Sequence, residues 1–192
     1  MNNLEHHGKI PQKSWKPEKR KKVTIAIGLI SKPKGLAPSI IFASDSQTTY
    51  GSTKSLDAQK ISIIDFADTQ VLVAQAGTAE LADKAIEIMR KLAKDTPFEN
   101  EETVSKIAVQ AIREIRNHLK ELNIGCVTTE DGWKRFFYEQ NYFQLLVGCF
   151  YNWKPYMFTV DIDTCMSIPV KNQYAAIGGG KNMGEFLIRE SG

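Results

Sequence analysis

The apolar positions along the chain change their spacing several times, and each pattern predicts a different element. Residues 23–30 (VTIAIGLI) and 40–43 (IIFA) are apolar and rich in β-branched side chains. The segment between them contains glycine and proline, so we expect an antiparallel hairpin. Residues 59–65 and 70–76 predict a second hairpin in the same way.

The spacing of apolar residues then lengthens to between three and four positions. Residues 78–93 show this helical spacing, with Thr78 placed to act as an N-cap. Residues 101–122 predict a second helix with a single apolar face. That face consists of Val104, Ile107, Ala108, Ala111, Ile112, Ile115 and Leu119.

A third hairpin is predicted after an irregular segment at residues 123–141. Its strands are residues 143–151 and 156–161, joined by the sequence Asn-Trp-Lys-Pro. A short strand at 167–170, an apolar run at 175–180 and the start of a helix at 182–189 complete the order.

Strands that occur in groups, with helices grouped between them, indicate an α+β fold. The chain lacks the regular alternation of strand and helix that builds parallel sheets. We therefore expect two stacked antiparallel sheets that are covered by helices.

Charge divides the chain into a basic arm and a slightly acidic remainder. Residues 1–22 hold seven Lys and Arg against two Glu, a net charge of +5. The whole chain carries +3, so residues 23–192 carry a net −2. We predict a disordered arm or propeptide at 1–22 and one domain at 23–192. A domain without basic excess is not expected to bind nucleic acid.

The cysteines do not have the spacing of a disulfide-stabilised or a zinc-stabilised domain. Cys126, Cys149 and Cys165 are odd in number and widely spaced, and no CxxC motif accompanies them. Neither a disulfide framework nor a zinc site is expected, and reduced thiols indicate a cytoplasmic protein. No apolar run approaches the roughly 20 residues of a membrane helix, so no membrane association is expected.

Several short motifs then occur in a fixed order: TIAIGLI, IIFASDSQTT, DAQKI, VAQAGT, FQLLVGCFYNWKPYMFTVD and YAAIGGG. In this order they resemble the strands of proteasome β-type subunits, and the resemblance covers residues 23–192. That family belongs to the N-terminal-nucleophile (Ntn) hydrolases, and bacterial proteasome-like proteins are among its members. The resemblance implies a four-layer αββα sandwich, of which this chain is expected to lack the C-terminal elements.

The same resemblance implies a catalytic set. In these hydrolases a Thr, Ser or Cys begins the mature chain, and its own α-amine, with a pKa near 8, acts as the base. Thr24 would be the nucleophile, and Asp45 and Lys60 would be its charged partners. The backbone N–H of Gly77 would stabilise the oxyanion.

Substrate binding is implied at three further positions. Thr49 would hold the substrate main chain in strand-like fashion. Gln47 and Gln75 lie in segments whose side chains shape the specificity pocket in this architecture. The substrate would be a peptide or another amide, and neither a metal nor an organic cofactor is implied. Family members form rings, which implies a homo-oligomer.

Two points stay open in the sequence. Thr24 does not begin the chain, so it requires processing, or a translation start at Val23 from a GTG codon. A register shifted by one residue would instead place Val23 at the nucleophile position and predict an inactive subunit. The resemblance therefore implies a threonine-type peptidase or amidase that uses Thr24 after processing. The alternative is a non-catalytic structural subunit or an inactive truncated paralogue.

Overall fold

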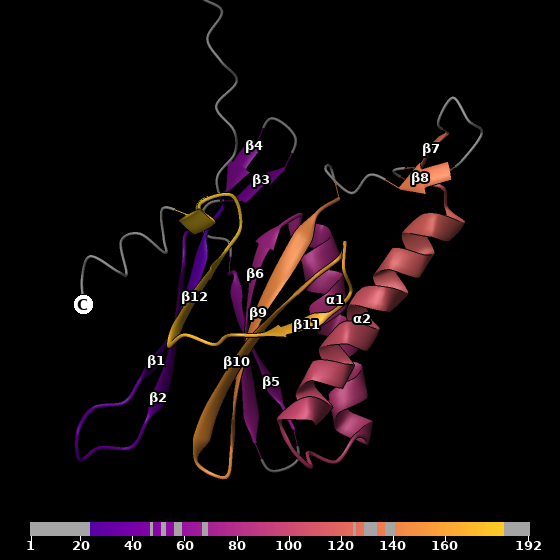
Figure 1. Ribbon diagram of the computed structural model, residues 1–192. Coiled ribbons are helices and arrows are strands. Elements are labelled where there is room, and N and C mark those ends of the chain that lie inside the picture. The colour runs from indigo at the N-terminus through magenta and orange to yellow at the C-terminus, as the bar shows by residue number, and fades with distance from the viewer. Residues whose placement is uncertain are drawn as a thin grey trace, which may run out of the picture.

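The structure is a computed structural model that describes residues 24–46, 48–50, 53–55, 59–66, 69–124, 126–128, 134–136 and 141–182. Two antiparallel sheets lie face to face, and two helices cover the outer face of the larger sheet (Figure 1). The predicted α+β arrangement of stacked antiparallel sheets is confirmed. The arm at 1–22 and the helix expected at 182–189, apart from its first residue, lie outside the described residues.

The smaller sheet has three strands in the order β12-β1-β2. Its strands are β1 (Ala26–Ser31), β2 (Ser39–Ser44) and β12 (Tyr174–Ile177). Successive side chains of a strand point to opposite faces, so Ala26 and Ile30 are buried against the larger sheet while Leu29 is exposed on the outer face. Strand β12 pairs with β1, so the first and the last strands of the described residues lie side by side.

The larger sheet has five strands in the order β11-β10-β9-β6-β5. They are β5 (Ile61–Asp65), β6 (Gln70–Gly77), β9 (Phe143–Tyr151), β10 (Lys154–Asp161) and β11 (Ser167–Pro169). The second and third predicted hairpins meet where β6 pairs with β9. Most residues of these two central strands are buried because helices cover one face and the smaller sheet covers the other.

The two helices, α1 (Ala79–Asp95) and α2 (Glu101–Glu121), form one layer beside the larger sheet (Figure 1). Asn100 caps α2 because its side-chain oxygen accepts a hydrogen bond from the Thr103 N–H at 3.2 Å. All seven residues of the predicted apolar face of α2 are buried. Thr78 is the N-cap residue of α1, as predicted, but its side chain makes no capping hydrogen bond.

Two glycines allow the sheets to approach closely. A Cβ added to Gly28 of β1 would lie 2.8 Å from side-chain atoms of both Leu146 and Phe42. A Cβ added to Gly148 of β9 would lie 2.9 Å from Ile40. Real Cβ atoms do not tolerate these distances. Leu146 of the facing sheet and Phe42 of the neighbouring strand fill the space at Gly28. Ile40 of the facing sheet fills the space at Gly148.

The structure corrects two details of the prediction. The segment at 123–141, expected to be irregular, contains the short paired strands β7 (Cys126–Thr128) and β8 (Lys134–Phe136). Strand β10 begins at Lys154, two residues earlier than predicted, because the turn before it needs only two residues. A further small hairpin pairs β3 (Thr48–Tyr50) with β4 (Thr53–Ser55).

The described residues supply three of the four expected layers: one layer of helices and two sheets. On the outer face of the smaller sheet Leu29 is 37% exposed and Ile41 is 51% exposed. No helix among the described residues combines the length and the apolar character needed to cross a membrane.

Candidate active site

Asp45 and Lys60 form an ion pair between the two sheets. Asp45 follows β2 and Lys60 precedes β5, so each residue stands at the end of a strand. The Lys60 Nζ atom lies 2.9 Å from Asp45 Oδ1. The Lys60 side chain is 5% exposed and that of Asp45 is 28% exposed. A buried ammonium group loses its hydration. The negative charge of the Asp45 carboxylate compensates for that loss.

The Asp45 carboxylate also holds the backbone beside Thr24. Its Oδ1 atom accepts a hydrogen bond from the Ile25 N–H at 3.1 Å, while the Asp45 N–H donates to the Ile25 carbonyl oxygen at 3.2 Å. One carboxylate oxygen therefore binds both Lys60 and the residue that follows Thr24. The ion pair is therefore tied to the backbone that directly follows the half-buried Thr24.

A glycine-rich turn after β12 packs against the carbonyl group of Thr24. The Gly180 N–H donates to the Thr24 carbonyl oxygen at 3.4 Å. Gly178 has a φ of 90°, and an added Cβ would lie 2.2 Å from the same carbonyl oxygen. Only glycine fits here, since any side chain would displace the Thr24 backbone.

Gly77 lies at the end of β6 that adjoins this turn. It has a φ of 105°, and an added Cβ would come within 2.3 Å of the Tyr142 carbonyl oxygen. The residue before Gly77 is Ala76. Its Cβ atom would lie 2.9 Å from a Cβ added to Gly178. Chain segments around residues 24, 77 and 178, far apart in sequence, therefore meet at one end of the sandwich.

Of the three predicted substrate-binding residues, Gln47 lies outside the described residues. Thr49 is described in its backbone only, which pairs with Lys54 in the β3–β4 hairpin. Gln75 is 5% exposed and its Nε2 donates to Asp83 Oδ1 of α1 at 2.8 Å. The structure therefore turns the Gln75 side chain toward the helices, away from the side of β6 that faces Thr24.

The direction of Gln75 follows from strand alternation. Its neighbours Ala74 and Ala76 pack with Ala26 between the sheets, so the residue between them must point to the opposite face. There its Oε1 atom is buried and has no hydrogen-bond partner among the described residues.

Gln144 is a residue of the site that the sequence did not single out. It lies on β9 opposite Ala76, and its Oε1 atom accepts a hydrogen bond from the Gly178 N–H at 3.1 Å. Its side chain therefore holds the glycine turn that packs on Thr24. A single glutamine within the apolar run FQLLVG was the available signal, because a polar side chain in a buried strand requires a partner.

Tyr142 adds an uncharged hydroxyl beside Gln144. Burial raises the pKa of the half-buried Tyr142 to about 12, and the nearby carboxylates of Asp161 and Asp163 add to the increase. A hydrogen bond with the Gln144 side chain opposes it. The phenol is therefore protonated throughout the neutral pH range.

Solved structures of proteasome-type proteins have the same fold. The chain is similar to Anbu, described as an ancestral beta-subunit, from Yersinia bercovieri, with a TM-score of 0.65 and 16% identity over 87% of this chain and 65% of that one. A Gly-1 mutant of Anbu from Hyphomicrobium sp. strain MC1 matches with a TM-score of 0.62 and 15% identity, over 86% and 64% of the two chains.

Eukaryotic HslV from Trypanosoma brucei is a third similar structure. Its TM-score is 0.56 at 18% identity, over 87% of this chain and 78% of that one. The fold is thus that of the proteasome-type Ntn hydrolases, as the motif order implied. The chain spans slightly less than two thirds of the length of the Anbu chains. Comparison with protein-family models found no match, and neither did comparison with curated protein sequences.

Proposed function

We propose that this protein is a threonine-type hydrolase, a peptidase or amidase, with Thr24 as its N-terminal nucleophile. The observation that carries this proposal is the position of the Asp45 carboxylate. A single oxygen atom accepts from Lys60 Nζ at 2.9 Å and from the N–H of the residue after Thr24 at 3.1 Å. A buried charge pair fixed to the backbone beside a hydroxyl residue is what activation of that hydroxyl requires.

The reaction follows from these positions. The Thr24 Oγ1 atom attacks the substrate amide carbonyl, and the free α-amine of Thr24 takes the hydroxyl proton. The positive charge of Lys60 would lower the free energy of the developing alkoxide, while the contact with Asp45 at 2.9 Å holds the ammonium group in place. The proton passes to the leaving amine as the C–N bond breaks, which leaves an ester on Thr24. Water then attacks the ester, releasing the carboxylic acid and restoring the hydroxyl.

Gly77 has the oxyanion role in this proposal. Its backbone N–H would donate to the negatively charged oxygen of the tetrahedral intermediate. Its position beside the Gly178 turn supports this role, because both glycines are held close to backbone carbonyl oxygens that leave no room for a side chain.

Assembly is a second part of the proposal. The Anbu complex from Pseudomonas aeruginosa, which has a TM-score of 0.60 with this chain, is described as a helical assembly. We infer from this likeness that the present chain forms a homo-oligomer, and the exposed Leu29 and Ile41 mark one apolar surface of the sandwich available for contacts.

The test begins with the N-terminus of the protein expressed with its native start. Intact mass and N-terminal sequencing should find a mature chain that begins at Thr24. A β-lactone electrophile should then acylate Thr24, and peptide mapping should locate the label there. Thr24→Ala should abolish labelling, and Thr24→Ser should retain it in part.

Thr96→Ala is the matched control, since Thr96 is a half-buried threonine that follows α1. It should label at the rate of the unmodified protein. A chain that keeps its residues before Thr24, folds normally and takes up no label would contradict the proposal and identify a structural subunit.

A further inference from the structure

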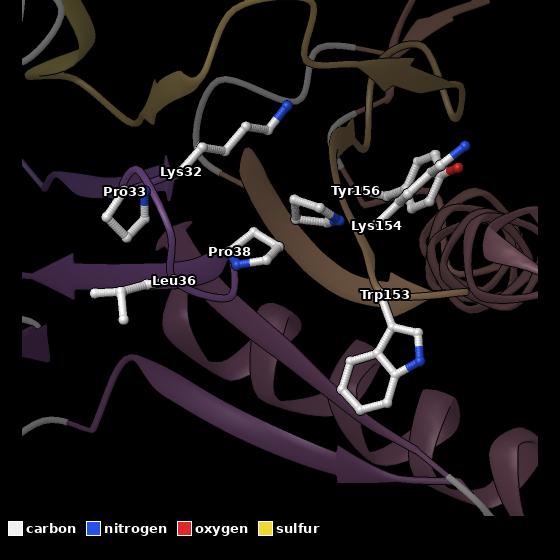
Figure 2. Close-up of a pocket in the computed structure, with 8 residues that line it drawn as sticks. Lys32, Pro33, Leu36, Pro38, Trp153, Lys154 and Tyr156 are labelled. Carbon is white, nitrogen blue, oxygen red and sulfur yellow. The ribbon is translucent and has the colours of Figure 1, made fainter.

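A groove opens at the end of the sandwich opposite to Thr24. It has a volume of about 480 Å³ and lies between the β1–β2 loop and the β9–β10 turn (Figure 2). Lys32, Leu36 and Pro38 line it from the loop, and Trp153, Lys154 and Tyr156 line it from the turn. Thr24 precedes β1 and Lys32 follows it, so the length of one six-residue strand, roughly 20 Å, separates the groove from the candidate active site.

Trp153 is the most unusual residue of the groove. Its side chain is 87% exposed and extends away from the turn (Figure 2). Its φ is 62° and that of Asn152 is 49°, the left-handed conformations that a two-residue hairpin turn requires. Asparagine suits this conformation, and glycine is strongly preferred at the position that Trp153 occupies. A large aromatic side chain is therefore kept in a strained backbone position without the benefit of burial.

Leu36 extends the apolar surface from the opposite side. It is 73% exposed, in a loop where Gly35 also has a positive φ of 78°. Pro33, Pro38 and Pro155 line the same groove and have no backbone N–H to offer. A ligand would consequently be recognised through side chains rather than by addition of a strand.

The charge of the groove is uniformly positive. Lys32 and Lys154 contribute amines from its two sides, and none of its lining residues is acidic. Neither amine has a salt-bridge partner within the part of the chain that the structure describes. An apolar surface between two available cations complements a ligand that combines carboxylates with an apolar side chain.

We propose that this groove binds an acidic, extended peptide segment of a partner protein. An apolar side chain of that segment packs on Trp153 and Leu36, and carboxylates on either side of it pair with Lys32 and Lys154. A long polyanion fits less well, because residues 23–192 carry a net charge of −2 and would repel it beyond the two lysines. This inference does not depend on Thr24 acting as a nucleophile.

The test is selection from a phage-displayed library of random dodecapeptides on the immobilised full-length chain. Selected peptides should be enriched in Asp and Glu beside Leu, Phe or Pro. Their affinity, measured by biolayer interferometry, should fall roughly thirtyfold in Trp153→Ser, as expected for an aromatic anchor. It should fall about tenfold in the double variant Lys32→Gln/Lys154→Gln, and it should weaken as salt is raised.

The controls are an exposed apolar residue and an exposed lysine elsewhere on the surface. Leu122 is 56% exposed beyond the end of α2, and Lys106 is an exposed lysine of the same helix. Leu122→Ser and Lys106→Gln should leave peptide affinity unchanged. Trp153→Gly gives a second readout: it should lose binding while its Tm stays equal to or above that of the unmodified protein, because glycine relieves the positive φ.

Three results would overturn the proposal. One is a selection that yields no peptides above background, or peptides without an acidic bias. Another is equal loss of affinity in the Leu122 control. The third is dissociation of a homo-oligomer by Trp153→Ser in analytical ultracentrifugation, which would assign the groove to a second copy of this chain.

Discussion

The two ends of the same sandwich are built in opposite ways. At the Thr24 end Lys60 is 5% exposed and paired with Asp45, and two glycines with positive φ let backbone segments pack tightly against one another. At the Trp153 end two lysines have no acidic neighbour in the groove, and positive φ values occur at exposed residues. Because the strands between the two ends are shared, the difference resides in the loops.

This difference separates two kinds of function. Covalent chemistry requires groups that are held in one geometry, and the backbone contacts of three segments at the Thr24 end suit that proposed role. Docking of a flexible partner requires exposed anchors and available charge, which the Trp153 end provides. Positive φ values occur at both ends, but only at the Thr24 end do closely packed backbone atoms require glycine at those positions.

The largest expected effect comes from substituting alanine for one glycine with positive φ at each end, which tests whether the Thr24 end is packed more tightly. In Gly178→Ala the new methyl group would lie 2.2 Å from the Thr24 carbonyl oxygen, so unfolding free energy should fall by about 3 kcal/mol. In Gly35→Ala nothing lies within 4 Å of the new methyl, and only the backbone cost of about 1 kcal/mol remains. Urea denaturation measures both, and equal losses would show that the Thr24 end is not tightly packed.

The second contrast compares two lysines. Lys60→Met leaves the Asp45 carboxylate without its ammonium partner, and stability should fall by about 2 kcal/mol, less than for a fully buried pair because Asp45 is 28% exposed. Lys154→Met removes a solvated charge, and the change should stay within about 0.5 kcal/mol. Thermal unfolding of both variants checks this, and a similar Tm for both would contradict the buried role of Lys60.

The smallest expected effect is confined to alkaline pH. Burial raises the pKa of Tyr142 to about 12, whereas the phenol in the unfolded chain titrates near 10. Above pH 10 the unfolded state loses this proton first, so Tyr142 makes stability decrease as pH rises toward 12. Tyr142→Phe should flatten that decrease in urea titrations between pH 9 and 12 and leave neutral stability almost unchanged. An identical slope in both proteins would show that Tyr142 is not buried beside Gln144.

Local patterns predicted most of the individual elements. The apolar face of α2 was predicted residue by residue, because a helical period over 21 residues leaves little ambiguity. The hairpins at 59–76 and 143–161 were identified because each brings neighbouring segments together through a short turn. The turn at Asn152 and Trp153 was predicted too long, since tryptophan is an unexpected residue at a left-handed position.

The candidate site was less accessible to prediction. Thr24, Asp45, Lys60 and Gly77 were selected through resemblance in motif order, and the structure brings the segments that carry them to one end of the sandwich. Gln75 was selected on the same ground, yet its side chain bonds Asp83 on the helical side. Side chains alternate between the two faces of any strand. When both faces are buried, the sequence does not reveal which face meets the helices.

The sequence by itself determined the order and type of most elements, and it showed that residues 1–22 carry a net +5 whereas residues 23–192 carry a net −2. Periodicity and turn chemistry are local properties, so they can be read from neighbouring residues. Only the tertiary structure decided that β12 returns to β1, that β6 pairs with β9, and that Gln144 holds the Gly178 turn against Thr24. Those contacts join residues more than 30 positions apart, and they form because two apolar sheet faces bury each other.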